Sequence, residues 1–384
     1  MSNARGEGPR TASEVDGGGL LAAVAALAPT IRAAAGEIER ERSLTPALVE
    51  ALTDAGIYRL GMPRDLGGCD VDPVTVLRVV EALSKADASV GWNALLAFQN
   101  AWFAALLPEL AAREVFRNPR GIIAGNVPPR NRAVACADGY RLSGRWVSVS
   151  GILHADWLFA GAPIYDGDAP RLDAAGRPVT RLFFFPRDQA TLVDAWTTTG
   201  MRGTGSHDFT LDDLVVPENF AADLAAPPWH PWPLFHSFTL ICPVHGAHAL
   251  GTAAAAFAEV VTLAQTKVPS RQTQPLREQG WFQAQVVHAD GLVQAARSLL
   301  YEATAALWET VAVGAAPTLE QRARVRLASN VAAANAVEVV DAMYQAAGAP
   351  RSTPPARSTA TCGICTRRSR IRRSHPRSGR RSAV

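Results

Sequence analysis

The hydrophobic period of this 384-residue chain changes twice, and those changes limit the folds that it can adopt. Apolar residues recur at helical spacing over residues 20–118, and helical spacing returns after residue 241. Between them, residues 120–225 hold short strand-like runs bounded by turn residues, with a hairpin signal at Asp138-Gly139. Strands and helices do not alternate, which argues against a doubly wound nucleotide-binding fold. We expect an α+β chain with an N-terminal helical domain, a middle antiparallel β domain and a C-terminal helical bundle.

Local signals place the helices within this plan. Thr45-Pro46 and Asp72-Pro73 each put a capping side chain before a proline in the first helical turn. Three long segments, 243–265, 278–313 and 318–347, are joined by short loops and predict the bundle. The expected regions are a disordered leader at 1–19, a helical domain at 20–118, a β-barrel-like domain at 119–225, an incomplete bundle at 226–348 and an Arg-rich tail at 349–384.

Composition places the chain among globular proteins, with 48% hydrophobic and 19% charged residues. No apolar run of membrane-spanning length lacks a polar or charged interruption, and the N-terminus has no apolar signal-peptide region. Five cysteines are too few and too scattered for a disulfide framework. We therefore expect a cytoplasmic protein that does not bind a membrane.

Two stretches of the middle region carry the candidate chemistry. "GRWVSVSGILHADW", residues 144–157, brings aromatic, serine and histidine residues close together. Taken alone, it reads as a hairpin with aromatic residues in the core and serines on the wet face. "GMRGTGS", residues 200–206, is not a dinucleotide-binding loop, because a strand rather than a helix follows it. Taken alone, it is an irregular turn.

Together, in this order and between two helical regions, the two stretches resemble the acyl-CoA dehydrogenase superfamily over about residues 20–348. "TPALVEALTDAGIYRLGMPRDLGG" and "ADASVGW" also look like its N-terminal domain. The dehydrogenases usually carry a Thr-Glu-Pro-like loop before the flavin strand, where this chain has "NVPPRNRAVACADGY". The chain looks more like the flavin-dependent monooxygenases built on the same fold.

This resemblance implies a cofactor, partners and a reaction. Such enzymes receive reduced FMN or FAD from a separate flavin reductase, form a C4a-hydroperoxyflavin with O2, and hydroxylate a small aromatic, polyketide or amino-sugar substrate. It also implies a homo-oligomer, a tetramer in this family. Two alternatives stay open: an FAD-dependent acyl-CoA dehydrogenase, although no catalytic Glu can be assigned in the bundle, and a flavin-fold protein without catalysis.

By the same resemblance, flavin-contacting residues can be named. Ser150 is the candidate for the hydrogen bond to flavin N5, with Ser148 as the alternative. Trp146 would form an apolar wall beside the ring. The turn residues would contact the flavin or shape its pocket, and they are Arg202, Thr204 and Ser206.

Two further positions concern proton transfer and substrate orientation. His154 could transfer protons near neutral pH, or it could be a hydrogen-bonded structural histidine. The monooxygenases often carry a histidine on the helix where this chain has Gln99 and Asn100. An amide such as Asn100 can orient a substrate but cannot act as a base, which puts phenol deprotonation at that position in doubt.

The remaining motifs do not predict a metal or nucleic-acid site. His245-x-x-His248 has metal-ligand spacing but no third ligand nearby, and Cys362-x-x-Cys365 has only His375 close to it in the tail. Residues 351–384 contain ten arginines and no Asp or Glu, which leaves the rest of the chain with a formal charge of −7 out of a total of +3. An acidic body of this kind argues against nucleic-acid binding.

The tail also departs from the family pattern, which continues past residue 349 with a further helix. A shifted reading of plausible codons for Thr361–Arg368 spells Leu-Arg-Asp-Leu-His-Ala-Ala, similar to that helix. We therefore infer a frameshift, and expect loss of the helix to uncover Val331, Val339 and Met343 on the 318–347 segment.

Overall fold

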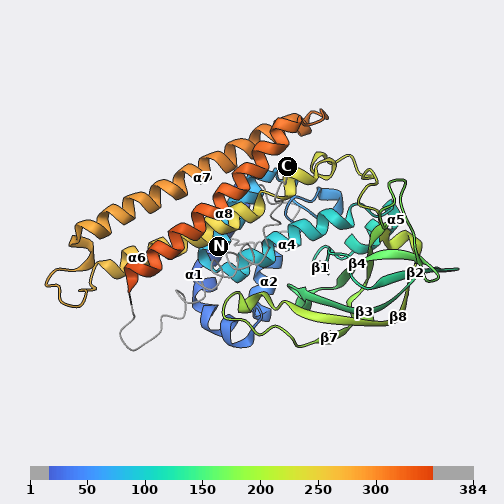
Figure 1. Ribbon diagram of the computed structural model, residues 1–384, viewed down its shortest axis with the longest axis horizontal. Helices are drawn as coiled ribbons and strands as arrows, with labels where there is room; N and C mark the ends of the chain where they lie inside the picture. Colours follow the sequence, from blue (N-terminus) through green and yellow to red (C-terminus); the bar gives the residue numbers. More distant parts are fainter. Residues whose placement is uncertain (1–16, 349–384) are drawn as a thin grey trace, which may run out of the picture.

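The computed structural model describes residues 17–348, whose elements form a helical region, a sheet and a second helical region in chain order (Figure 1). The first helix, α1, begins at Gly17, inside the leader expected at 1–19. The rest of that leader and the tail with Cys362 and Cys365, together with the inferred frameshift, lie outside the described residues.

Capping side chains start the N-terminal helices where the sequence indicated. Thr45 Oγ1 accepts a hydrogen bond from the amide of Leu48, and Asp72 Oδ1 accepts one from Val74. Asp87 caps the next helix in the same way, since its side chain accepts hydrogen bonds from the amides of Ser89 and Val90. The elements of this region are α1 (Gly17–Glu41), α2 (Pro46–Asp54), η2 (Ile57–Arg59), η3 (Arg64–Leu66), α3 (Pro73–Ala86), α4 (Ala88–Ala104) and α5 (Glu109–Phe116).

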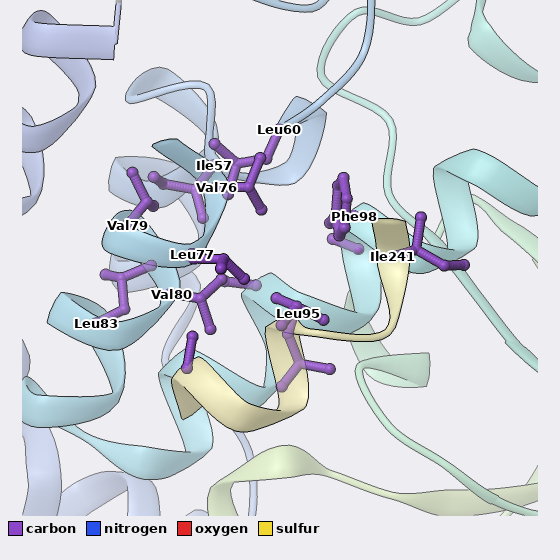
Figure 2. Packing of buried hydrophobic residues seen from close by; sticks show 14 of the residues in the cluster. Ile57, Leu60, Val76, Leu77, Val79, Val80, Leu83, Leu95, Phe98 and Ile241 are labelled. Atoms are coloured by element: carbon purple, nitrogen blue, oxygen red, sulfur yellow. The ribbon is translucent and has the colours of Figure 1, made fainter. Parts of the chain in front are cut away.

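The apolar core of this region lies where α3, α4 and η2 meet (Figure 2). Val76, Leu77 and Val80 of α3 are buried, as are Leu95 of α4 and Ile57 of η2. Most of α4 is buried, so it is a central helix rather than a surface one. It therefore has the position from which its polar residues can face an internal site.

The middle region is a sheet of nine strands in the order β7-β8-β3-β2-β4-β6-β9, with β1 and β5 also paired to β4. The expected hairpin is confirmed, since β2 and β3 pair antiparallel up to Cys136 and Gly139. The strands are β1 (Ile123–Asn126), β2 (Arg132–Cys136), β3 (Gly139–Val149), β4 (Trp157–Asp166), β5 (Ala169–Pro170), β6 (Thr180–Pro186), β7 (Thr191–Val193), β8 (His207–Val216) and β9 (Ala221–Ala222).

The expectation of a purely antiparallel β domain is wrong in one respect, because the sheet is mixed. Both β1 and β2 run parallel to β4. Parallel neighbours need a long crossover connection. Here β3 and the short helix η4 (Ile152–His154) lie between β2 and β4 in the chain and provide it.

The C-terminal region confirms the three predicted helices within two residues at each end: α6 (Val244–Ala264), α7 (Gly280–Ala312) and α8 (Leu319–Ala347). The long helices lie side by side away from the sheet (Figure 1). The expectation that Val331, Val339 and Met343 are uncovered is wrong, because α8 packs against α6 and α7. Val339 and Met343 are fully buried, and Val331 is partly buried against the core.

Two helical segments are long and apolar enough to cross a membrane by length and composition, which the sequence analysis did not expect. They are Gly17–Glu41 and Phe238–Ala264. More than half of the apolar window in the second segment, 56%, is buried inside the protein, as in a core helix of a soluble protein. The feature is weak evidence for a membrane.

Candidate active site

One face of α4 opens onto a small cavity beside the sheet. Asn93, Leu96, Ala97 and Asn100 have the spacing of a single helix face, and all four line the cavity. Its enclosed part is about 10 Å³, room for about one water molecule, and the space reaches about 260 Å³ only when open solvent at the mouth is counted. The other lining residues come from η2, the start of β1 and the end of β3 with η4; they are Tyr58, Ile122, Ile123, Ala124, Ser150, Gly151 and His154.

The three predicted catalytic residues, Asn100, Ser150 and His154, all line this cavity. They come from a helix, a strand end and a short helix that are separate in the chain. The chain turns from β3 into η4 at Gly151, whose φ is +74° and where a Cβ would lie 2.8 Å from Asn93 Oδ1. A residue without a side chain is therefore required to bring Ser150 and His154 against α4.

Asn100 and Tyr58 have fixed hydrogen-bonding roles at the cavity. Asn100 Nδ2 donates to the carbonyl oxygen of Ile123 at 2.9 Å, so the amide is held in place. Tyr58 is buried, and burial raises the pKa of its phenol well above the ordinary value. Its hydroxyl group therefore stays protonated at neutral pH and can donate a hydrogen bond.

His154 is half-buried, and its Nε2 lies 3.0 Å from Ser43 Oγ. Burial lowers the pKa of the imidazole, and the positive charge of Arg187 lowers it further. The ring is therefore neutral at pH 7 and able to accept a proton. Both roles left open by the sequence, proton transfer and structural hydrogen bonding, are compatible with this arrangement.

Hydroxyl groups form a chain behind Ser150. Ser150 Oγ lies 2.6 Å from Ser206 Oγ, and Ser206 Oγ lies 2.6 Å from Thr204 Oγ1. Trp92 Nε1 donates to Ser150 Oγ at 3.1 Å, and Thr204 Oγ1 donates to the carbonyl oxygen of Met201 at 2.8 Å. The structure thus joins the two sequence motifs through direct contacts between their side chains.

A β-bulge on β3 separates residues that the sequence analysis grouped together. Pairing with β8 shifts register between Trp146 and Val149, and Ser148 has a left-handed φ of 58°. Asp208 holds this backbone, since its Oδ1 accepts from the Ser148 amide at 2.8 Å. The bulge places Val149 in the core with Trp146 and releases Ser150 toward the cavity.

The bulge corrects the role expected for Trp146. This side chain is 0% exposed, stacks on Phe209 at 5.4 Å between ring centroids, and donates to the carbonyl oxygen of Gly161. It has no surface left for a flavin ring, so it does not form the predicted wall. Ser148 is exposed to solvent and is not among the residues that line the cavity, whereas Ser150 is.

Arg202 fastens the glycine-rich turn to α1. Its guanidinium group donates to the carbonyl oxygens of Glu39 and Thr198 and lies 3.4 Å from the Glu39 carboxylate. Ser206 contacts Ser150 directly and Thr204 reaches it through Ser206, whereas Arg202 contacts Glu39 and Thr198. None of these three turn residues is among the cavity residues that the structure describes. The sequence left two roles open for this arginine, contacting the flavin or shaping its pocket. Its contacts with the described residues match the second role.

The side chains of His245 and His248, which have metal-ligand spacing in the sequence, lie beside hydrogen-bonding side chains instead. His248 Nδ1 lies 2.9 Å from Ser84 Oγ, and Gln99 Nε2 donates to the carbonyl oxygen of Ile241 with His245 nearby. Among residues 17–348, no group of three or more His, Cys, Asp or Glu residues could hold a metal ion.

Sequence reasoning missed Trp92, Asn93 and Tyr58. Trp92 is the last residue of "ADASVGW", a stretch that was noticed only for its family resemblance. Asn93 could have been found from its spacing to Asn100, seven residues on, which places both on one helix face. Nothing in the local sequence distinguishes Tyr58 from an ordinary core aromatic residue.

Asn126, at the end of β1, was also missed. Its Nδ2 donates to the carbonyl oxygen of Val147 at 2.8 Å, while its Oδ1 is buried with no hydrogen-bond partner among the described residues. Buried polar atoms almost always have partners. An acceptor of this kind is therefore suited to an N–H group of a bound molecule.

Comparison with known proteins identifies the family. Residues 21–114 match the N-terminal domain of acyl-CoA dehydrogenase, and residues 243–353 match its C-terminal domain. An indole-3-acetate monooxygenase from Pseudomonas putida is 30% identical over 319 residues, covering 83% of this chain and 80% of the relative.

Two more relatives extend the similarity to solved structures. The oxygenase subunit HsaA, a flavin-dependent monooxygenase from Mycobacterium tuberculosis, is 28% identical over 87% of this chain and 86% of its own length. Its crystal structure matches with a TM-score of 0.81, covering 92% of each chain at 26% identity. XiaF from a Streptomyces species, solved with FADH2 and glycerol, matches with a TM-score of 0.80 over 91% of each chain at 27% identity.

Proposed function

This chain belongs to the flavin-dependent monooxygenases of the acyl-CoA dehydrogenase superfamily, and from that premise we propose that it hydroxylates a small, neutral aromatic substrate in the cavity beside α4. Reduced flavin, when bound, supplies the two electrons by which one oxygen atom of O2 leaves as water while the other enters the substrate. The observation that carries the proposal is the convergence of Asn100, Ser150 and His154 on one cavity.

The residues present fit a reduced flavin. Ser150 presents a hydroxyl group to the cavity, and Asn126 offers a buried carbonyl oxygen without a partner among the described residues. A reduced flavin ring carries N–H groups, which such oxygens accept. Ser150 would hold the ring edge, with Ser206 and Thr204 positioning its hydroxyl group from behind, and Asn126 would bind a further N–H group.

The lining favours an uncharged, largely apolar substrate. Leu96, Ala97, Ile122 and Ile123 provide apolar surface, and no Asp, Glu, Lys or Arg is among the cavity residues that the structure describes. An amino sugar carries an ammonium group, which would be costly to bury without a carboxylate. An aromatic compound such as a phenol or an indole avoids that cost, and a planar ring matches apolar walls.

Polar groups at the cavity would orient the substrate and move protons. Asn100, held by Ile123, orients a substrate hydroxyl or N–H group. His154 is neutral because its pKa is lowered, so it can take a proton from a phenol, the role that Asn100 cannot perform. Tyr58, with its raised pKa, keeps its proton and acts only through hydrogen bonding.

The alternative of an acyl-CoA dehydrogenase has less support. That reaction removes an α-proton with a carboxylate base, and the described lining of the cavity includes no Asp or Glu. The relatives described above are monooxygenases.

The relatives imply one partner protein, and our proposal adds an oligomeric state and a location. A separate flavin reductase is implied, because relatives such as HsaA are oxygenase subunits. A homo-oligomer, a tetramer by family resemblance, and a cytoplasmic location are further parts of our proposal.

Anaerobic titration with reduced FMN and reduced FAD, followed by exposure to ¹⁸O₂ with a panel of phenols and indoles, tests the proposal. We expect binding of one reduced flavin and a product heavier by one ¹⁸O atom, detected by mass spectrometry. Failure of a folded sample to bind either flavin would refute the proposed function. Hydroxylation of amino sugars alone would refute the substrate class.

A further inference from the structure

The hydroxyl chain behind the cavity has two chemically different ends. Trp92 Nε1–H can only donate a hydrogen bond, and the carbonyl oxygen of Met201 can only accept. Three hydroxyl groups lie between them, Ser150, Ser206 and Thr204, at 2.6 Å from one to the next. The end contacts, at 3.1 Å from Trp92 and 2.8 Å to Met201, are also within hydrogen-bonding distance.

When every one of these bonds is made, only one arrangement of protons is possible. Thr204 gives its single hydroxyl proton to Met201, so Ser206 must donate to Thr204. Ser206 then has no proton left for Ser150, so Ser150 must donate to Ser206. Ser150 also accepts from Trp92, and its oxygen keeps one lone pair and no proton for any other partner.

We propose that this directed chain makes Ser150 an obligate hydrogen-bond acceptor at the cavity, and that it thereby selects reduced over oxidised flavin. Flavin N5 carries a proton in the reduced form and is a bare acceptor in the oxidised form. An acceptor at Ser150 can form a hydrogen bond with the N5–H group of reduced flavin but not with the bare N5 of oxidised flavin. A monooxygenase that takes its flavin from solution needs this discrimination, so the inference rests on the proposed function.

The burial of the chain supports this role. Thr204 and Ser206 are 2% and 4% exposed, so solvent water does not compete for their protons. Hydrogen bonds in such surroundings are stronger and polarise one another. Thr204 is not among the cavity residues, so its hydroxyl group can influence a ligand there only through Ser206 and Ser150.

The test uses the full chain and a matched pair of substitutions at Thr204. Thr204→Val keeps the side-chain shape and removes the hydroxyl group, whereas Thr204→Ser keeps the hydroxyl group. Without Thr204 as acceptor, Ser206 can donate to Ser150, which frees the Ser150 proton for the cavity. The ratio of the Kd for oxidised FMN to that for reduced FMN should then fall about five- to tenfold in Thr204→Val, the effect of one hydrogen bond, and keep its wild-type value in Thr204→Ser.

Two further measurements locate the effect. Trp92→Phe removes the external donor but leaves Ser150 donating to Ser206, so the ratio should persist even where both affinities weaken. Reduced 5-deaza-FMN has carbon in place of N5, so the wild-type protein should bind it no more tightly than oxidised 5-deaza-FMN. Anaerobic titrations followed by tryptophan fluorescence or flavin absorbance give these constants without any turnover.

The outcomes separate this inference from the proposed function. An unchanged ratio in folded Thr204→Val, with reduced FMN still bound, would overturn the directed chain and leave the monooxygenase proposal intact. If circular dichroism shows that Thr204→Val does not fold, Ser206→Ala decides, because it removes the acceptor of the Ser150 proton directly and should lower the ratio as much. Failure of the wild-type protein to bind FMN or FAD in either redox state would overturn both proposals.

Discussion

Trp146 and Ser150 lie four residues apart, one on β3 and one just past its end, yet their surroundings are opposite. Trp146 is sealed in the apolar core of the β region, stacked on Phe209. Ser150 lies at the cavity and is bonded to the hydroxyl group of Ser206, and through it to that of Thr204. In a regular strand, residues separated by an even number of positions share a face. The bulge at Ser148 breaks that rule and lets one short motif serve both stability and a site.

Trp146→Ala should have the largest effect on stability. Removing a fully buried aromatic side chain leaves a cavity and costs about 3–5 kcal/mol. Denaturant unfolding should show this loss, and Trp146→Phe should show a smaller one. A stable Trp146→Ala protein that has lost only flavin binding would restore the wall role and contradict the burial argument.

Asp208→Ala should loosen the bulge that separates the two environments. Its carboxylate is buried and accepts from the Ser148 amide and the Arg145 side chain. Hydrogen bonds to a charged group contribute about 1.5–3 kcal/mol, so the free energy of unfolding should fall by about that amount. Reduced-flavin affinity should fall as well, since Ser150 is no longer held in register.

Asp212→Ala is the matched control on the same strand, because that side chain is exposed. It should change stability by no more than about 0.5 kcal/mol. Equal losses in the two variants would mean that the Asp208 contacts do not stabilise the bulge.

Ser150→Ala should alter chemistry more than stability. The loss of a hydrogen-bonding hydroxyl group costs about 1 kcal/mol, and the expected functional effect is more hydrogen peroxide released per product formed. Peroxide and product assays in the presence of reductase and substrate measure this ratio. Ser148→Ala, on the exposed side of the bulge, should keep the wild-type ratio. A change in Ser148→Ala alone would move the role to that residue.

The smallest expected effect concerns the pH dependence set by His154. Because its folded-state pKa is lowered from 6.5, the unfolded chain takes up a proton at this position before the folded protein does as the pH falls. Stability is therefore fully present above about pH 6.5 and declines below it. His207, whose pKa burial also lowers, contributes in the same direction.

Comparing the wild-type protein with His154→Gln isolates the His154 contribution. The variant should lose less stability between pH 7 and pH 5, measured by urea unfolding at each pH. An identical decline in both proteins would show that His154 does not contribute.

Much of the fold could be predicted because its signals are local. Caps at Thr45 and Asp72 and the turn at Asp138-Gly139 act over a few residues, and each was confirmed. The parallel pairing of β1 and β2 with β4 was not predicted, because it depends on how distant strands meet rather than on any local pattern.

The site was predicted less completely, for the same reason. Asn100, Ser150 and His154 were named, but on the strength of a family resemblance, and the residue that orients Ser150 was not. Trp92 lies 58 residues from Ser150 in the chain, so no spacing rule could link them. Tyr58 was missed because a buried tyrosine in a core and one beside a cavity look alike in sequence.

The sequence by itself determined which segments are helices and strands, their order, and the set of hydroxyl and amide groups available for chemistry. Periodicity and capping act through neighbouring residues, so they can be read directly from the chain. The tertiary structure alone decided which of those groups face the cavity. A single bulge reverses the side to which every following side chain points. The contacts that fix it, from Asp208 to Ser148 and from Trp92 to Ser150, join residues about 60 positions apart, which only folding brings together.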